Sequence, residues 1–249
     1  TTEIYTLSLH DALPILYSKK SELSPHIMKS LISKIIKRFS LVPAVLGLLV
    51  LAPAGTFDFW QFYVYTGILI IPMTFVLFYF LKKDPQFLER RTRAEEKEKA
   101  QKIIQIVFST VFLFGFIVPG LDKRFGWSEI PVYLVLIADL VILLGYLLIF
   151  FVFRQNSYAS RIVEVDENQK VITTGLYSIV RHPMYMGVLI MYMPTPLALG
   201  SWWGLIPMAG IPLALVLRIL NEEKVLCRDL PGYTEYCKKT KYRLIPFVW

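Results

Sequence analysis

The sequence predicts an all-α integral membrane protein with about five to six transmembrane helices. Of its 249 residues, 55% are hydrophobic and only 18% are charged, and the mean hydropathy is +0.51. A soluble domain of this length is less apolar and more charged. Several apolar segments also reach the roughly 20 residues that cross a hydrocarbon core. These segments are 35–56, 59–81, 103–120, 131–153, 185–200 and 203–220.

The segments divide the chain into three parts. Residues 1–33 form an N-terminal leader or tail, whose first 18 residues lack the basic and apolar regions of a signal peptide and read as non-native or as a short surface helix. Residues 34–153 carry four transmembrane helices. Residues 154–249 carry two further membrane segments, which are short and interrupted by proline and therefore predict a tight hairpin or a tilted, partly interfacial pair.

The distribution of lysine and arginine predicts the orientation. The two termini, the loop after the second segment and the stretch 154–182 together hold 24 of these residues, whereas the opposite loops hold 2. Because cytoplasmic loops carry an excess of positive charge, we expect both termini and any site at this end to be cytoplasmic. A net charge of +8 in so apolar a chain then indicates a bilayer partner rather than nucleic acid.

The polar residues do not predict a metal site. Cys227 and Cys237 are ten residues apart in a polar tail, which is neither a disulfide framework nor a metal-ligand spacing. Of the three histidines, only His182 lies in a motif-like setting. The basic loop "ERRTRAEEKEKAQK" is typical of a solvated helix.

The stretch "SRIVEVDENQKVITTGLYSIVRHPMY" (160–185) differs from the apolar segments around it. Its β-branched alternation predicts a short hairpin or an extended loop, followed by a turn. Pro183 suits the first turn of the next helix. The N–H groups and the positive dipole end of that helix then face the cytoplasm, where they can hold a carboxylate.

A second polar group occurs in "LRILNEEKVL" (217–226). Arg218 and Glu222 are four residues apart and share a helix face, about 40° from each other, whereas Glu223 points away from Arg218. Charged groups at the inner end of a membrane helix are candidates for a functional site.

Each feature also has a purely structural interpretation. Arg181 and His182 fit snorkelling interface residues, and Arg218 with Glu222 fits an intrahelical ion pair. Tyrosines near both motifs fit an aromatic belt. The functional interpretation gains weight because the turn, the helix start, the imidazole and the Arg/Glu pair are all predicted on one side of the membrane.

The same residues carry a resemblance. The ordered set "TGLYSIVRHPMYMG", "RILNEEKVL", "PGYTEYCKK" and "YRLIP", over roughly residues 155–249, resembles the isoprenylcysteine carboxyl methyltransferase family and its relative, phosphatidylethanolamine N-methyltransferase. The resemblance implies a membrane-embedded methyltransferase with a cytoplasmic S-adenosylmethionine pocket formed by the C-terminal part. It also implies a lipid or lipidated small molecule as the acceptor, and no metal.

The resemblance further implies roles for individual residues. Arg218 corresponds to the arginine that faces the substrate and is the candidate catalytic and substrate-binding residue. An amine acceptor stays open as an alternative; it would have to lose a proton, and Glu223 is then the candidate substrate-binding residue that accepts it. The residues implied in cofactor binding are Val171, Ile172, Tyr177, His182, Pro183, Met184, Tyr185 and Glu222.

The acceptor predicted in this way is a carboxylate. A carboxylate is already ionised at pH 7 and needs no general base, and a guanidinium fork is suited to orient it. One departure concerns the acceptor: the eukaryotic enzymes that act on prenylated proteins have a longer acidic run where this chain has "NEE".

Two alternatives stay open. NADPH-dependent membrane sterol and steroid reductases also carry an "RHP" turn and an aromatic C-terminal pattern ending in "IPF", although Met184 and Val188 stand here where those enzymes carry polar residues. A non-enzymatic membrane scaffold or transporter is the second alternative, for which Asp139 is the one candidate for a buried relay.

Overall fold

The structure is a computed structural model, and it describes residues 24–92, 99–159, 162, 165 and 169–249. All regular structure in these residues is helical. The helices are α2 (Pro25–Ala54), α3 (Trp60–Lys83), α4 (Pro85–Thr92), α5 (Lys99–Phe125), α6 (Val132–Gln155), α7 (Leu176–Ile179), α8 (Pro183–Tyr192), α9 (Thr195–Ala198), α10 (Leu205–Met208), α11 (Gly210–Asp229) and α12 (Tyr233–Lys239).

Five helical segments in the described part of the chain are long and apolar enough to cross a membrane. Their bounds are His26–Ala54, Trp60–Lys83, Ala100–Phe125, Val132–Gln155 and Leu205–Asp229. This confirms the predicted all-α membrane fold. The chain is a multi-pass membrane protein.

The predicted segment bounds need three corrections. Helix α2 begins at Pro25, ten residues before the predicted start, where Ser24 caps its N-terminus. The predicted segment 185–200 is two helices, because the chain turns at Met193 and Pro194 between α8 and α9. Helix α11 continues nine residues beyond residue 220, since no proline or glycine stops it before Asp229. Glu222 and Glu223 therefore lie within a long helix.

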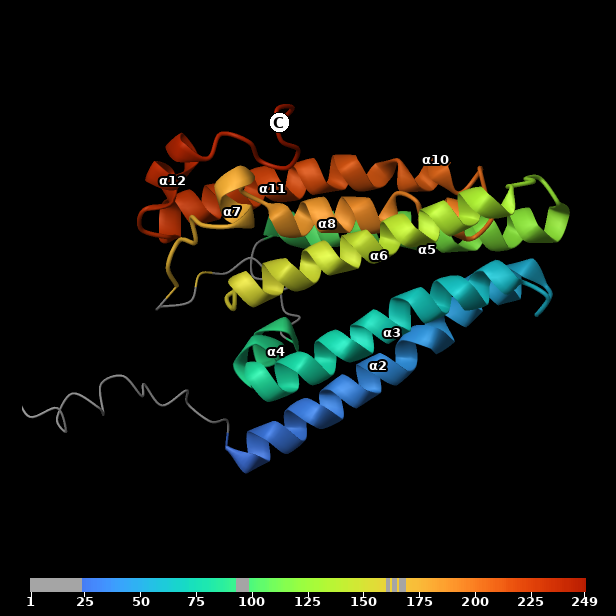
Figure 1. Cartoon of the computed structure of the whole chain (residues 1–249), viewed down its shortest axis with the longest axis horizontal. Coiled ribbons are helices and arrows are strands. Elements are labelled where there is room, and N and C mark those ends of the chain that lie inside the picture. Colours follow the sequence, from blue (N-terminus) through green and yellow to red (C-terminus); the bar gives the residue numbers. More distant parts are fainter. Residues whose placement is uncertain (1–23, 93–98, 160–161, 163–164, 166–168) are drawn as a thin grey trace, which may run out of the picture.

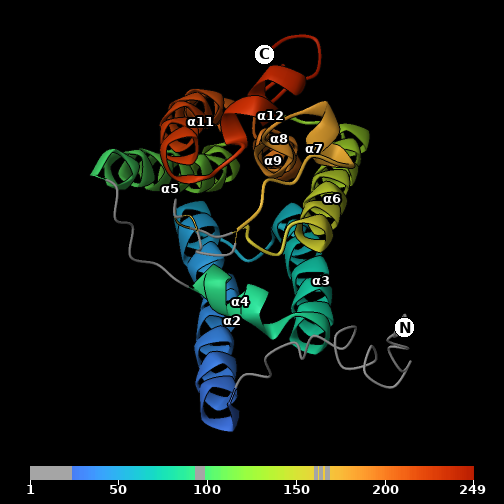
Figure 2. The ribbon, with the colours of Figure 1, turned by 90° about the vertical axis from the view of Figure 1, so that its left-hand side faces the viewer.

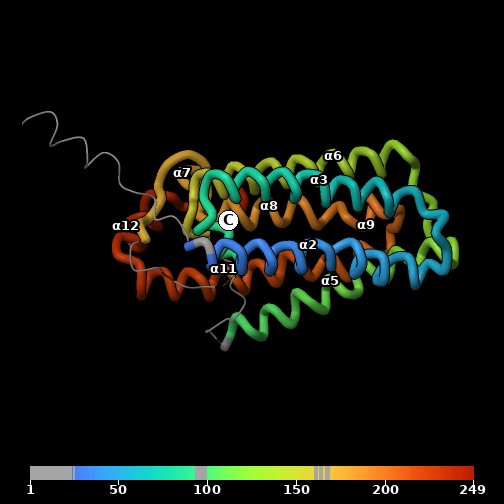
Figure 3. The backbone as a smooth tube through the Cα atoms, turned by 90° about the horizontal axis from the view of Figure 1, so that it is seen from below, coloured from blue at the N-terminus to red at the C-terminus, as the bar shows by residue number. Residues whose placement is uncertain are grey.

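The helices form two layers. Helices α2 and α3 lie side by side in one layer, and α5, α6, α8 and α11 form the other (Figures 1 and 2). Helix α5 diverges from its neighbours toward its N-terminal end (Figure 3). Helices α8 and α9 run back along α6, and α10 and α11 return to the end where α12 lies, so the last two segments form the predicted hairpin (Figure 1).

One hydrophobic core joins the first four membrane helices to the C-terminal part. It includes Val50, Phe62 and Ile142 as well as Leu215 and Ile219. Packing therefore continues across the boundary that the sequence suggested at residues 153 and 154.

Helices α6 and α8 approach each other closely at two glycines. A side-chain carbon added at Gly145 would lie 2.9 Å from the backbone nitrogen of Met191, and one added at Gly187 would overlap Ile149. Small residues allow this close helix packing in membranes. The contact fixes the start of α8, and with it the "RHP" turn, against the rigid helix α6.

The predicted leader, residues 1–18, lies outside the described residues, as does most of the predicted hairpin 161–168. Residues 169–173, which the structure describes, adopt neither helix nor strand, in agreement with the extended-loop alternative. In the basic loop, residues 85–92 form α4, which buries Phe87 and Leu88.

Candidate active site

The turn before α8 is held by the C-terminal tail. The backbone N–H groups of Arg181 and His182 donate hydrogen bonds to the carbonyls of Tyr242 and Arg243, both at 2.9 Å. His182 is the N-cap of α8 and Pro183 its first helical residue, as predicted. The "RHP" turn therefore has a fixed backbone at the end of the bundle that carries α7 and α12 (Figure 1).

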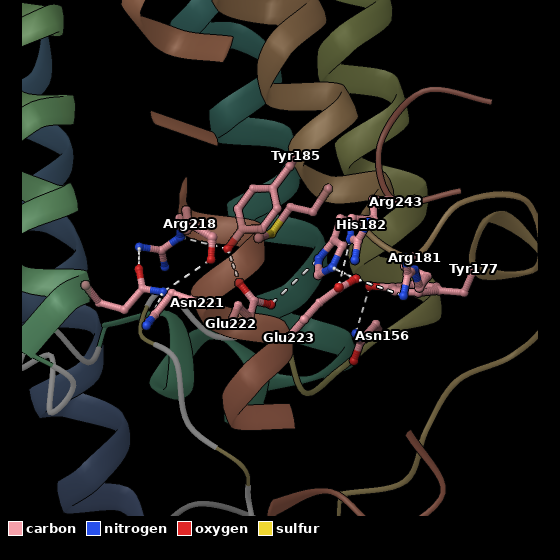
Figure 4. Close-up of polar contacts among 12 residues, drawn as sticks. Asn156, Tyr177, Arg181, His182, Tyr185, Arg218, Asn221, Glu222, Glu223 and Arg243 are labelled. Atoms are coloured by element: carbon pink, nitrogen blue, oxygen red, sulfur yellow. Dashed lines mark hydrogen bonds and ion pairs between the residues drawn. The ribbon is translucent and has the colours of Figure 1, made fainter. Parts of the chain in front are cut away.

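Glu223 joins this turn to α11 and to the tail. Its Oε1 lies 3.2 Å from Arg181 Nη1 and 3.2 Å from His182 Nε2, and its Oε2 accepts a hydrogen bond of 2.8 Å from Arg243 Nε (Figure 4). The carboxylate is 7% exposed. A buried carboxylate needs such partners, because an unpaired charge in the interior is costly.

Tyr185 connects Arg218 to Glu222. Its hydroxyl accepts a hydrogen bond of 2.7 Å from Arg218 Nε and donates a short hydrogen bond to Glu222 Oε2 (Figure 4). The ring of Tyr185 also stacks on His182, with ring centroids 5.7 Å apart. Arg218 and Glu222, which the sequence predicted on one helix face, are therefore both bound by a tyrosine from α8.

Gln101 on α5 holds the other side of Arg218. Its Oε1 accepts a hydrogen bond of 3.1 Å from Arg218 Nη1. Its Nε2 donates to Asn221 Oδ1 at 2.8 Å and to the Arg218 carbonyl at 3.3 Å. Because Gln101 is fully buried, water does not compete for these hydrogen bonds, and they fix the plane of the guanidinium.

A polar cavity lies between the turn, the loop before it, α11 and α12. Glu222, His182 and the loop residues Val171 and Ile172 line it, together with a cage of aromatic residues. The aromatic residues are Tyr158, Tyr177, Tyr185, Tyr233 and Tyr236. We call this space the polar cavity.

Tyr177 is held in place within the polar cavity. Asn156 Nδ2 donates to its hydroxyl at 2.8 Å, and the Tyr236 hydroxyl donates to its carbonyl at 2.6 Å. Burial raises the pKa of Tyr177 to about 12, against the effect of the Asn156 hydrogen bond. The phenol therefore stays neutral at physiological pH, and it lines the cavity as a hydrogen-bonding group.

Two buried polar atoms, which belong to residues that line the polar cavity, have no hydrogen-bond partner among the described residues. They are the Tyr233 hydroxyl and Arg181 Nε. Buried polar groups in folded proteins nearly always have a partner. These two atoms, with the Glu222 carboxylate, fit a ligand that carries both donors and acceptors.

A second, mostly apolar cavity of about 580 Å³ lies deeper among the membrane helices. Met73 on α3, Phe108 and Phe112 on α5, and Ile149 and Phe153 on α6 contribute to its walls. We call it the apolar cavity.

The two cavities share a wall. Met184, Tyr185 and Arg218 line both of them. A molecule in the apolar cavity and a molecule in the polar cavity would therefore meet at the Arg218–Tyr185 hydrogen bond.

The comparison with protein families bears on this region directly. Residues 133–229, which include all of α6 except Val132, the turn, α8 and all of α11, match the phospholipid methyltransferase family. The match covers less than half of the chain, and it agrees with the resemblance inferred from the sequence.

Among solved structures, this chain is similar to the eukaryotic intramembrane Ras methyltransferase, an isoprenylcysteine carboxyl methyltransferase. The identity is 15%, the match covers 95% of this chain and 91% of that chain, and the TM-score is 0.44.

The structure brings most of the predicted site residues together. Arg218 and all eight residues predicted to bind the cofactor line the polar cavity. Glu223 is not among the described residues that line either cavity, since its carboxylate is turned toward Arg181, His182 and Arg243. We therefore regard it as a structural residue of the turn.

Sequence reasoning missed Gln101, Asn156 and the pairing of residues 181–182 with the tail. Gln101 and Asn156 are single amides with no pattern around them, and they reach the site only through tertiary packing. The four hydrogen-bonding groups of an amide side chain favour a partner when buried. That general preference carries no information on which residue the partner is.

Proposed function

We propose that this protein is an S-adenosylmethionine-dependent methyltransferase that acts on a lipophilic carboxylate of the isoprenylcysteine type. The observation that supports this most is the shared wall of the two cavities, at Arg218 and Tyr185. A polar cavity for a water-soluble cofactor and an apolar cavity for a lipid chain meet there.

The polar cavity fits the cofactor chemically. The Glu222 carboxylate and the aromatic rings suit a cationic, aromatic ligand. The partnerless Tyr233 hydroxyl and Arg181 Nε suit its polar groups. We propose that Val171, Ile172, Tyr177, His182, Pro183, Met184, Tyr185 and Glu222 hold it.

When bound, S-adenosylmethionine supplies a methyl group on a sulfonium cation. Transfer of this methyl group to an acceptor carboxylate would leave a neutral ester and a neutral thioether, and it would release no proton. Because two opposite charges disappear, a site of low dielectric favours the reaction. No general base is needed, which agrees with the engagement of Glu223 elsewhere.

The task of this chain is then positioning. Arg218 presents a guanidinium whose plane is fixed by Tyr185 and Gln101. A fixed planar fork orients a carboxylate better than a mobile ammonium. The chain of the acceptor occupies the apolar cavity, whose walls are mostly aliphatic and aromatic.

We further propose that the termini and the active site face the cytoplasm, on the basis of the lysine and arginine distribution. A variant without Cys227 and Cys237 provides the background for single cysteines at the exposed residues Lys170 and Trp203. In intact cells, a membrane-impermeant maleimide should label position 203 and leave position 170 unlabelled until the cells are opened. Labelling of position 170 in intact cells would contradict this orientation.

A further inference from the structure

A second arginine reaches the apolar cavity. Arg91, near the end of the short helix α4, is half-buried and lines the apolar cavity together with Arg218. The sequence predicted a solvated residue here, because the surrounding run is strongly charged. The structure instead turns its guanidinium inward over the ring of Phe153, 4.8 Å from the centroid.

Arg91 lies against the wall that the two cavities share. Its Nη1 lies 3.9 Å from the sulfur of Met184, which is adjacent in the chain to the Tyr185 that binds Arg218. Two guanidinium groups therefore flank consecutive residues of α8. Apart from them, the described lining of this cavity contains no charged side chain.

Helix α4 is fastened in this position. Phe87 and Leu88 bury one face of the helix, Arg90 Nε donates to the Ser157 carbonyl at 2.9 Å, and Arg38 Nη1 donates to the Thr92 carbonyl at 2.9 Å. The helix lies across the ends of α2 and α3 (Figure 2). Arg91 is thus held over the cavity by contacts on both sides of it.

From this arrangement we infer that Arg91 is a second recognition residue for the headgroup of the acceptor and selects an amphiphile that carries a carboxylate. The inference rests on the proposed function of the apolar cavity. A cation beside a cavity of low dielectric attracts an anion more strongly than it would in water. The cavity walls themselves accept an aliphatic chain whatever its headgroup, so the charge preference comes from the arginines.

Arg91 and Arg218 have different roles in binding the acceptor. Arg218 has its plane fixed by two hydrogen bonds and orients the reacting oxygen. Arg91 contacts a thioether and an aromatic face on the cavity wall, and it contributes attraction for the anion. Loss of Arg91 should therefore raise KM for an acidic acceptor about 10-fold and change kcat little, as for a residue that acts on binding alone.

The test measures binding of two matched probes to purified protein without any cofactor. One probe is S-farnesyl-N-acetylcysteine, and the other is its methyl ester, which has the same chain and no charge. Wild type should bind the acid more tightly than the ester. Arg91→Gln should lose about 10-fold affinity for the acid and keep its affinity for the ester. Arg91→Lys, which retains the charge, should restore most of the preference.

The matched control is Arg228→Gln, which removes a guanidinium whose side chain is 64% exposed and which lines neither cavity. It should leave both affinities unchanged. Equal losses for acid and ester in Arg91→Gln, or no loss for either, would overturn the inference. Because no cofactor is present, a protein that prefers the acid but does not bind S-adenosylhomocysteine would refute the proposed function and leave the role of Arg91 standing.

Discussion

Replacing Arg218 by lysine should lower the rate of methyl transfer by roughly 100-fold, the usual effect of losing one preorganised donor. The lysine keeps the positive charge but loses the planar fork, and with it the hydrogen bonds to Tyr185 and Gln101. The affinity for S-adenosylhomocysteine should change by less than about 3-fold, since Glu222 and the aromatic cage remain. The measurements are single-turnover rate with S-farnesyl-N-acetylcysteine and equilibrium binding of S-adenosylhomocysteine.

The control for this substitution is Arg228→Lys on the same helix. Arg228 is 64% exposed at its side chain and pairs with Asp229, so its replacement should leave both quantities unchanged. A parallel loss of rate and cofactor affinity in Arg218→Lys would mean that Arg218, Tyr185 and Glu222 act as one structural unit. The hydrogen-bonded connection through Tyr185 makes this the sharpest competing account.

Replacing Glu222 by glutamine should act mainly on the cofactor. The change removes the negative charge that faces the polar cavity and weakens the acceptor of the Tyr185 hydroxyl. A hydrogen bond to a charged group contributes about 1.5–3 kcal/mol, so we expect a loss of roughly 10- to 100-fold in affinity for S-adenosylhomocysteine. Isothermal titration calorimetry of the purified variant measures this affinity.

Glu235→Gln is the matched control, because Glu235 is an exposed carboxylate on α12 at the same end of the protein. Its affinity for S-adenosylhomocysteine should equal that of wild type. If Glu222→Gln also keeps wild-type affinity, Glu222 is part of a structural ion-pair network and does not bind the cofactor.

The fold could be predicted from the sequence because the bilayer imposes a simple rule. A membrane helix must be long and apolar, and this requirement is visible in the residues themselves. The predicted helix ends were less accurate than the predicted helices themselves. Helix α11 continues through Glu222 and Glu223, since Tyr185 binds the first carboxylate and Arg243 the second. Hydropathy alone places a boundary before them.

The candidate site was predictable where its residues are close in sequence. His182, Pro183, Met184 and Tyr185 form one run, and Arg218 and Glu222 are one helical turn apart. Residues that arrive from other helices were not predictable. Gln101 and Arg91 lie far from both motifs in the chain, and only the packing of α4 and α5 brings them to the shared wall. Glu223 shows the reverse case, because its sequence position suggested a substrate role and its buried partners make it structural.

Titration of the purified protein with S-adenosylhomocysteine and, separately, with NADPH tests most directly whether the polar cavity binds S-adenosylmethionine. The aromatic cage, the Glu222 carboxylate and the partnerless Tyr233 hydroxyl predict saturable binding of S-adenosylhomocysteine and no binding of NADPH. Binding of NADPH, with none of S-adenosylhomocysteine, would contradict the account and move the protein to the class of membrane reductases that share the "RHP" turn.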